Sequence, residues 1–415
     1  MSEQIERNYD VIVIGGGAAG FFGAIEVARL NPTLRILILE KSNKVLAKVK
    51  VSGGGRCNVT HHCFEAPELA KHYPRGAKTL KGLFRHFHAG DMVDWLKARG
   101  VEVHAEEDGR MFPVTNDSQT IIDCFVNEAL RRNIRIHLGQ GVTTVSSEGD
   151  RFRIATLSGE EYTASKVLIA IGGSPNPSAY QFIAGLGHTI RKPIPSLFTF
   201  NDAGKAFVDL MGVSVKDATV RIEGTRYAQR GPVLITHWGL SGPAVIKLSA
   251  WAAEHLHEAA YTFRVHVNWC GDTSENEIRS YFEEHRQVKG KQNIHGNALF
   301  GIPTRLWIRL CMYAEIPEDK IWSELPKKNL NRLIEFLIRC PFSMAGKTTY
   351  KEEFVTCGGV PLNEIHSDRM ESKIVKGLFF AGEALDIDGE TGGFNFQAAW
   401  TTGFLAARAI AEDLK

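Results

Sequence analysis

The clearest hydrophobic pattern in the chain lies near its N-terminus. An apolar run over residues 10–14 leads into the glycine-rich stretch 15–20, and a second apolar run over 35–39 ends at Glu40. Short unbroken apolar runs are typical of strands buried in a parallel sheet, and the residues after the glycines have the spacing of a helix. The pattern therefore predicts a strand, a helix and a second strand within the first forty residues.

Further along, the period of the apolar positions changes several times. Helical spacing predicts a helix over 91–99 ended by Gly100 in a left-handed conformation, and a second helix capped by Ser118 that buries Ile121, Ile122, Phe125 and Leu130. Strand-like segments follow at 134–138, 142–146, 151–157, 161–163 and 167–171. Alternation over 218–223 and 261–267 predicts half-buried strands, 275–340 is mainly helical, and the last seventy residues return to strand, glycine loop and helix.

This order predicts an α/β protein in which a nucleotide-binding domain is interrupted by insertions. The expected segments are 1–192 for the first part of the nucleotide-binding domain, 193–274 for an inserted β domain, 275–340 for a helical domain, 341–353 for a return strand of the β domain, and 354–415 for the second part of the nucleotide-binding domain. The two halves of one domain thus lie at opposite ends of the chain.

The glycine-rich stretch has the spacing of a dinucleotide fingerprint. Gly15 permits a tight turn, Gly17 lets the backbone approach a pyrophosphate, and Gly20 allows close packing of helix on strand. The phosphates are expected at the start of the helix, near Ala18 and Ala19. Glu40 is placed to accept hydrogen bonds from ribose hydroxyls and would repel a 2′-phosphate, which favours FAD or NAD over NADP.

Two later segments favour a flavin. Residues 379–383 resemble the terminal strand of flavoproteins in which a late Gly-Glu pair, here Gly382 and Glu383, meets the ribityl and pyrophosphate region. The stretch 389–395 then leads into a helix, whose first backbone N–H groups could stabilise negative charge on the pyrimidine edge of a reduced flavin. The alternative is that these glycines only form turns.

Together these segments resemble the HI0933-like flavoproteins, also described as NAD(P)/FAD-dependent or aminoacetone-oxidase-like oxidoreductases. The resemblance covers nearly the whole chain and rests on 11–20, 52–60, 109–113, 236–243, 356–360, 370–373 and above all 378–397. It implies a Rossmann-type FAD-binding domain with an inserted antiparallel β-barrel-like domain and a helical domain. The loop after the glycine pair 172–173 is shorter than is usual in the family, which leaves the substrate and electron donor open.

The fingerprint and the resemblance together predict an FAD site, with no metal. Its expected residues are Gly15, Gly17, Ala18, Ala19, Gly20, Glu40, Lys41, Gly54, Gly55, Arg56, Cys57, Asn58, Val142, Ala170, Gly172, Gly173, Gly382, Glu383, Asp386, Gly392, Gly393, Phe394, Asn395 and Gln397.

No residue stands out as catalytic. Cys57 and His237 are the candidates, against the plainer interpretations of a buried thiol and a structural or solvent-facing histidine. Arg56 could fix a phosphate or an anionic substrate. Cys57 and Cys63 have one more intervening residue than the dithiol of disulfide-reductase flavoproteins, so an active disulfide is disfavoured.

The composition indicates which kinds of partner and which compartment to expect. The 415 residues carry a formal charge of only +2, which argues against a broad nucleic-acid surface, and the seven scattered cysteines fit reduced thiols. The polar N-terminus lacks a secretion signal and no apolar stretch is long enough to span a bilayer, so we expect a cytoplasmic protein.

We therefore expect an FAD-dependent oxidoreductase that acts on a small or medium-sized organic substrate. Three alternatives stay open: an oxidase that returns electrons to oxygen, a flavin-dependent RNA-modifying protein, and a non-catalytic FAD-binding module. Only one complete fingerprint occurs, so NAD(P)H, if used, is expected to bind transiently over the flavin.

Overall fold

The computed structural model describes residues 7–348 and 355–415, which form two compact units. One unit contains residues 7–196 and 355–415, and the other contains 197–348. The two halves of the first unit therefore come from the two ends of the chain. Residues 1–6 and 349–354, which fall in the expected segments 1–192, 341–353 and 354–415, lie outside the described part.

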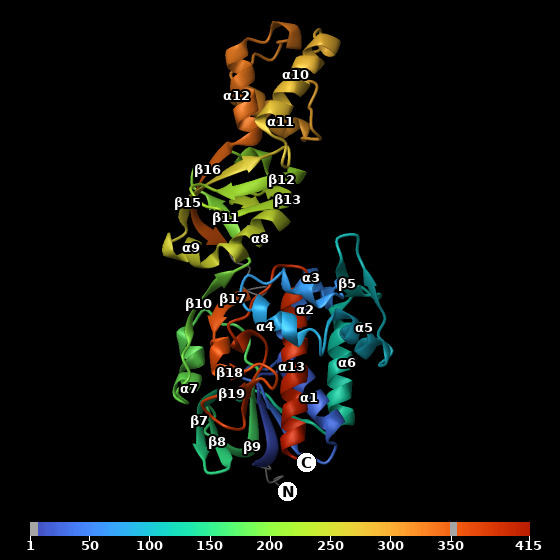
Figure 1. Ribbon diagram of the computed structural model, residues 1–415, viewed down its shortest axis with the longest axis vertical. Coiled ribbons are helices and arrows are strands. Elements are labelled where there is room, and N and C mark those ends of the chain that lie inside the picture. The colour runs from blue at the N-terminus through green and yellow to red at the C-terminus, as the bar shows by residue number, and fades with distance from the viewer. Residues whose placement is uncertain (1–6, 349–354) are drawn as a thin grey trace. The chain divides into compact units, whose positions relative to one another are not determined.

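A mixed sheet forms the centre of the first unit (Figure 1). Its parallel strands have the order β20-β9-β1-β2-β6; β19 and β18 continue it antiparallel beyond β20, and β8 and β7 pair antiparallel from β9. The bounds are β1 Asn8–Ile14, β2 Ile36–Leu39, β6 Arg135–His137, β7 Val142–Glu148, β8 Arg151–Thr156, β9 Glu161–Ile169, β18 Ile365–His366, β19 Glu371–Ser372 and β20 Leu378–Phe380. The central strands are buried on both faces, which explains their unbroken apolar runs.

Two helices from opposite chain ends pack side by side in this unit. They are α1 (Ala18–Leu30) and α13 (Phe394–Asp413), seen in Figure 1 as neighbouring blue and red helices. Glycines allow the close approach: a Cβ at Gly403 would lie 3.1 Å from the carbonyl oxygen of Ala19. The start of the cofactor fingerprint is thereby fixed against the last helix of the chain.

The remaining elements of the first unit surround this pair. The helices are α2 Ala47–Gly55, α3 Ala66–Ala70, α4 Ala77–Leu83, α5 Ala89–Lys97, α6 Ser118–Arg131 and α7 Gln181–Ala184, with 3₁₀ turns η1 Pro177–Tyr180, η4 Leu362–Glu364 and η5 Gly382–Ala384. Two small antiparallel sheets are formed by β3 Thr60–His61, β4 Val103–Ala105 and β5 Arg110–Pro113, and by β10 Arg191–Ser196 with β17 Val355–Gly359.

Several details of the sequence predictions are corrected. Asp117, not Ser118, caps α6: its side chain accepts the Gln119 N–H at 2.8 Å, while the Ser118 hydroxyl is buried and donates to the Lys50 carbonyl. Leu130 is 61% exposed because α6 buries a narrower stripe of residues than expected. Segments 161–163 and 167–171 are parts of the single strand β9 and its end. The left-handed conformation of Gly100 is confirmed, with φ of 78°.

The second unit is built on a closed antiparallel barrel of the described strands, in the order β11-β14-β13-β12-β15-β16. Their bounds are β11 Thr199–Asp202, β12 Ser214–Ile222, β13 Ala228–Ile235, β14 Gly239–Ser241, β15 Thr262–Asn268 and β16 Cys340–Thr348. The helices are α8 Pro243–Trp251, α9 Ala253–Glu258, α10 Glu275–Lys289, α11 Thr304–Tyr313 and α12 Lys327–Ile338, with η2 Val208–Leu210 and η3 Trp322–Glu324. The predicted fold class is confirmed.

The barrel and the helices of the second unit share an apolar core. Val265 and Val267 of β15 belong to the same buried cluster as Trp307 of α11 and Leu337 of α12. The domain bounds predicted at 274 and 340 stay predictions. The shared core contains residues from both sides of each bound.

Candidate cofactor site

The first glycine motif has the tight packing that its spacing predicts. Gly15 follows β1 with φ of 116°, and a Cβ there would lie 2.5 Å from the Ala170 carbonyl oxygen. At Gly20 a Cβ would lie only 1.9 Å from the Gly15 carbonyl oxygen. Because both neighbours are backbone atoms that cannot move aside, side chains are excluded at these two positions. The turn and the start of α1 are therefore fixed against the end of β9.

Gly17 differs from its two neighbours in the motif. A Cβ at Gly17 would meet no described atom within 4 Å, so the backbone at the start of α1 borders open space. Beside it, Glu40 accepts the Gly16 N–H with Oε2 and the Ser42 N–H with Oε1, each at 2.8 Å. An open helix start next to a fixed carboxylate fits the pyrophosphate and the adenosine ribose of a dinucleotide.

Three more predicted residues lie near this carboxylate. Ala170 follows β9 and donates its N–H to the Ile14 carbonyl at 2.9 Å, which places it against the glycine turn. The Gln140 N–H donates to the Glu40 carbonyl at 2.8 Å, so the chain entering Val142 at the start of β7 passes close to Glu40 and Lys41. These residues are grouped at the adenosine end of the expected site.

A second cluster surrounds Glu383 in η5. Its Oε2 accepts a hydrogen bond from Lys48 Nζ at 2.6 Å and from the Gly173 N–H at 3.0 Å. Its Oε1 is buried and has no hydrogen-bond partner among the described residues, and the same is true of the buried Thr356 hydroxyl. A Cβ at Gly173 would lie 2.8 Å from Thr356 Oγ1, so the glycine pair, the threonine and the glutamate are packed together.

Unsatisfied buried polar atoms are costly, about 1–3 kcal/mol each. A group with several hydroxyls would satisfy both Glu383 Oε1 and Thr356 Oγ1, and the ribityl chain of FAD is such a group. The residues present therefore fit a flavin nucleotide. Lys48 and Thr356 are absent from the sequence prediction, because no local signal links an α2 lysine or a β17 threonine to Glu383.

The loop 52–58 and the turn 389–395 are brought together although they are over 300 residues apart. The Asn58 side-chain amide, oriented by its hydrogen bonds, donates to the Thr60 carbonyl and accepts the Gly393 N–H, both at 3.0 Å. A Cβ at Gly393 would lie 2.5 Å from the Thr60 carbonyl oxygen. Gly54 and Gly55 have positive φ and border open space among the described atoms. They leave room for a planar ring against the backbone.

The polar side chains of the 386–397 segment are mostly hydrogen-bonded within the protein. The Asn395 amide closes the turn by accepting the Gly389 N–H at 2.9 Å and donating to the Gly389 carbonyl at 3.0 Å. Gln397 is buried, accepts from Thr60 and donates to Thr401. Asp386 forms an ion pair with Arg191 at 2.8 Å. The contribution of this segment to a cofactor would therefore come mainly from its backbone, including that of Gly392 and Phe394.

The two polar candidates of the loop 52–58 are already engaged. Arg56 donates to Glu106 at 2.6 Å, and its guanidinium lies 4.0 Å from the centre of the Phe112 ring. Burial raises the pKa of the Cys57 thiol to about 12, despite an opposing hydrogen bond with Ser52. A thiol with this pKa stays protonated at neutral pH, which disfavours Cys57 as a thiolate nucleophile.

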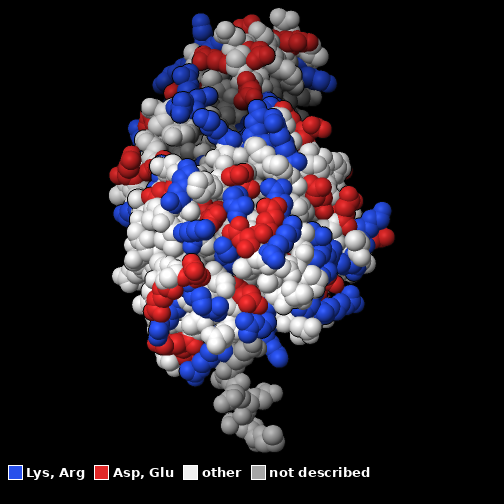
Figure 2. All heavy atoms as spheres, turned by 60° about the horizontal axis from the view of Figure 1, so that its bottom comes forward, with Lys and Arg blue, Asp and Glu red and all other residues white. Residues whose placement is uncertain are grey.

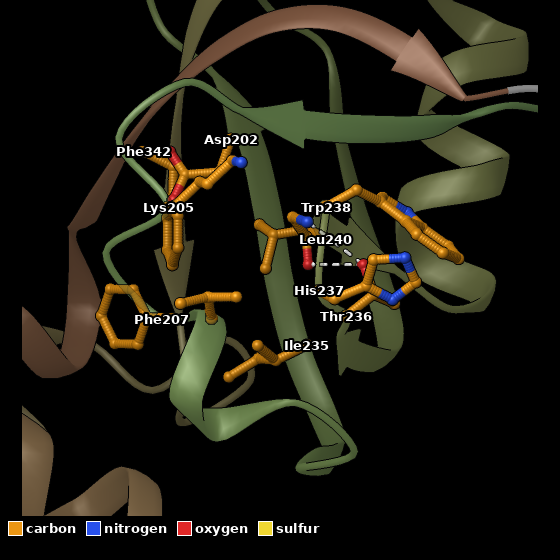
Figure 3. Close-up of a pocket in the computed structure, with 11 residues that line it drawn as sticks. Asp202, Lys205, Phe207, Ile235, Thr236, His237, Trp238, Leu240 and Phe342 are labelled. Atoms are coloured by element: carbon orange, nitrogen blue, oxygen red, sulfur yellow. Dashed lines mark hydrogen bonds between the residues drawn. The ribbon is translucent and has the colours of Figure 1, made fainter.

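His237 lies in the second unit, at the exposed turn between β13 and β14. It helps to line a small hollow with a volume of about 10 Å³, in which Phe207 and His237 lie on opposite sides with Ile235 and Leu240 between them (Figure 3). This volume is below the usual 300–1,000 Å³ of small-molecule sites. The hollow by itself therefore gives no evidence for substrate binding.

One face of the molecule carries charges of both signs. On the face drawn in Figure 2, basic and acidic side chains are interspersed. Within residues 7–348 and 355–415, none of the helices combines the length and the apolar character needed to cross a bilayer.

A family model described as the HI0933-like protein Rossmann domain matches residues 9–409. The chain belongs to this family. The family assignment from the sequence motifs is confirmed, and so is the prediction of a Rossmann-type, FAD-dependent oxidoreductase. The particular contact residues and the use of NAD(P)H stay predictions.

Two relatives of the chain are named for different activities. A 3-dehydro-bile acid delta(4,6)-reductase of Clostridium scindens is 27% identical over 96% of this chain and 98% of the relative. A ribosomal RNA dihydrouridine synthase of Escherichia coli is 28% identical over 98% of both. Among solved structures, a 3-ketosteroid delta1-dehydrogenase from Sterolibacterium denitrificans has a TM-score of 0.55 at 14% identity, covering 98% of this chain and 100% of that one. This last likeness concerns the fold.

Proposed function

We propose that this protein binds FAD between the glycine turn of α1 and the Glu383 cluster, and reduces a carbon–carbon double bond conjugated to a carbonyl in an organic substrate. The observation that supports the cofactor is the pair of buried, unpartnered acceptors, Glu383 Oε1 and Thr356 Oγ1, beside Gly173. In the proposed complex, Gly17 faces the pyrophosphate, Glu40 the adenosine ribose, and Glu383 with Thr356 the ribityl hydroxyls.

The reaction class is inferred from what the relatives' names have in common. A bile-acid delta(4,6)-reductase and a dihydrouridine synthase both saturate a ring double bond that is conjugated to a carbonyl. Bound FAD, once reduced, supplies a hydride to such a bond. The protein then has to hold the substrate against the ring, exclude water, and provide a proton for the second carbon.

Lys48 is the charged residue best placed to adjust the cofactor. Its side chain is 40% exposed and its ammonium group contacts Glu383 at 2.6 Å, so it neutralises the carboxylate that would otherwise face the site. Without this cation, an anionic glutamate would disfavour negative charge on a nearby cofactor. Lys48 thus makes an acidic ribityl ligand compatible with an electron-rich reduced ring.

The experiment that tests the proposal is a half-reaction. The purified protein is loaded with FAD, reduced anaerobically with dithionite, and mixed with 2-cyclohexen-1-one or a 4-ene-3-ketosteroid while flavin absorbance is followed. We expect reoxidation of the flavin with formation of the saturated ketone. If the protein takes up no FAD, or if neither these enones nor the RNA probe below reoxidises it faster than buffer does, the proposed function is wrong.

A second candidate substrate is uracil in ribosomal RNA, because one of the two relatives described above has that activity in its name. The same reduced protein is mixed with a uridine-containing ribosomal RNA fragment, and dihydrouridine is measured by mass spectrometry. Conversion of RNA without conversion of the enones would assign the RNA substrate. The small net charge favours the small-molecule substrate.

The electron donor can be tested by the same measurement of flavin absorbance. Our expectation from the single fingerprint is that NADH or NADPH reduces the bound flavin with weak saturation or not at all. Tight saturation at micromolar NAD(P)H would contradict it.

A further inference from the structure

A histidine–carboxylate pair lies against the turn that the cofactor is expected to meet. His72 lies in the loop between α3 and α4, and its Nδ1 is 3.1 Å from Oε2 of Glu390. The Glu390 side chain is 8% exposed, whereas that of His72 is 33% exposed. The carboxylate is therefore buried behind an imidazole that reaches solvent.

The position of His72 is fixed on three sides. Its carbonyl oxygen accepts the Glu390 N–H at 2.9 Å, so backbone and side chain of Glu390 both hold it. Its ring stacks on Phe394 with centres 4.2 Å apart and an interplanar angle of 13°. Phe394 is the first residue of α13 and is itself buried. The imidazole is thereby attached to the same helix start that the flavin is expected to approach.

The hydrogen bond to Glu390 determines the tautomer. An ionised carboxylate only accepts hydrogen bonds, so Nδ1 must carry the proton in both charge states of the ring. Nε2 makes no hydrogen bond to any described residue and is therefore the ring nitrogen left for an external partner. A buried carboxylate that orients a partly exposed histidine in this way is a common arrangement for proton transfer.

Another histidine of the same unit shows what a purely structural triad looks like. His188 lies between Glu364 Oε2 at 2.7 Å and the Ser372 hydroxyl at 2.8 Å, and its side chain is fully buried. The Ser372 oxygen also accepts the N–H groups of Ile374 and Val375. Both ring nitrogens of His188 are thus used inside the protein, whereas His72 keeps Nε2 for an external partner.

We propose that His72 is the proton donor for the substrate, with Glu390 as its positioning residue. This inference rests on the proposed function. In this reaction His72 Nε2 would deliver a proton to one carbon of the double bond, and bound reduced FAD would supply the hydride for the other carbon. The π bond would be lost, two C–H bonds would form, the two electrons would come from the flavin, and the neutral ring would take a new proton from solvent.

The test compares His72→Gln with a matched control, His86→Gln, which makes the same change at an exposed position of the same unit. Each protein is loaded with FAD and reduced with dithionite, and the flavin is then reoxidised either by 2-cyclohexen-1-one or by ferricyanide. Ferricyanide takes electrons without needing a proton on carbon. We expect His72→Gln to slow the enone reaction about 100-fold while leaving the ferricyanide reaction and the FAD content unchanged. His86→Gln should change neither.

Two further measurements separate proton donation from packing. In His72→Ala, added imidazole should restore a large part of the enone rate, because it can enter the space left by the ring and deliver a proton. In the wild-type apoprotein, ¹⁵N NMR should show neutral His72 with the proton on Nδ1, and Glu390→Gln should shift the tautomer balance.

The outcomes are distinguishable. If the wild type does not reduce the enone, the uracil RNA takes its place as the oxidant in the same comparison. If neither probe reoxidises the wild-type flavin, the proposed function fails. If the wild type reacts and His72→Gln reacts at the same rate, or if imidazole gives no rescue in a folded His72→Ala protein, the assignment of His72 is wrong.

Discussion

Two glycine-containing turns, one in each unit, look alike in the sequence and differ in the structure. The turn 389–395 is bonded to distant segments: Gly393 to Asn58, and Glu390 to His72. The turn between β13 and β14 is bonded mainly within itself and to the neighbouring barrel strand: the Gly239 N–H donates to the Thr236 hydroxyl, the Gly239 carbonyl accepts the Thr236 N–H, and the Trp238 carbonyl accepts the Asp202 N–H at 2.8 Å. The first turn is thus joined through side chains to segments over 300 residues away, whereas the second is joined to its own barrel.

The largest effect is expected where a glycine of the first unit contacts backbone. Gly20→Ala would place a methyl group 1.9 Å from the Gly15 carbonyl oxygen, and the two backbones cannot separate without breaking the turn. We expect the first unit to lose about 3 kcal/mol or more of stability. Gly82→Ala, at an open position in α4, is the control and should change the thermal midpoint little. A normal midpoint for Gly20→Ala would show that the turn is misplaced.

Gly17→Val should separate folding from cofactor binding. The new side chain enters space that is open among the described residues, so the apoprotein should melt like the wild type. The same space is needed by the pyrophosphate, and FAD affinity should fall about 100-fold or more. The FAD affinity is measured by fluorescence titration of the apoprotein with FAD. If the variant still binds one FAD per chain, the proposed site is wrong.

Glu383→Gln should have an intermediate effect. The amide keeps the shape but loses the charge that holds Lys48, and its Nε2 cannot accept from a ribityl hydroxyl. A hydrogen bond to a charged group contributes about 1.5–3 kcal/mol, so FAD should bind about 10- to 100-fold more weakly. His237→Gln, in the other unit, should leave FAD affinity unchanged. Equal losses of FAD affinity in both variants would show that the two units do not differ in cofactor binding.

The smallest effect is a pH dependence of stability. Burial tends to raise the pKa of Asp413, but hydrogen bonds from Lys166 and Arg369 outweigh it and hold the pKa below its ordinary value. The stabilisation is therefore complete above the unfolded pKa, near 3.9, and is lost as the pH falls through the lower folded value. Asp413→Asn should destabilise by up to about 1 kcal/mol at pH 7 and by progressively less below pH 4.

Asp217→Asn in the barrel is the comparison for this measurement. The hydrogen bond with Arg230 lowers the pKa of Asp217, but both side chains are more than half exposed. Urea midpoints at pH 7 and in acid should therefore change less for Asp217→Asn than for Asp413→Asn. A larger change for Asp217 would mean that solvent screening is overestimated here.

The sequence predicts local geometry well and distant partnerships poorly. The roles of Gly15 and Gly20 follow from spacing alone, because each acts on its immediate neighbours in a strand–turn–helix unit. The cap of α6 was misassigned by one residue, since adjacent Asp117 and Ser118 are both good caps. The sequence does not predict Lys48 and His72 because their partners Glu383 and Glu390 lie over 300 residues further along the chain. It does not predict Thr356 because Gly173, against which Thr356 packs, lies far earlier in the chain, and one sequence does not reveal which distant residues meet.

The pairing of the two chain ends in the first unit has a consequence for biosynthesis. Strand β9 needs β20 as its neighbour, and α1 needs α13, yet about 200 residues separate β9 from β20 and about 360 separate α1 from α13. At 5–20 residues per second, the early half of this unit waits about ten seconds or more for its partners, while the barrel strands emerge in between. Its unpaired edge at β9 is exposed during that time. The newly made chain is therefore most vulnerable to aggregation and proteolysis until α13 has left the ribosome.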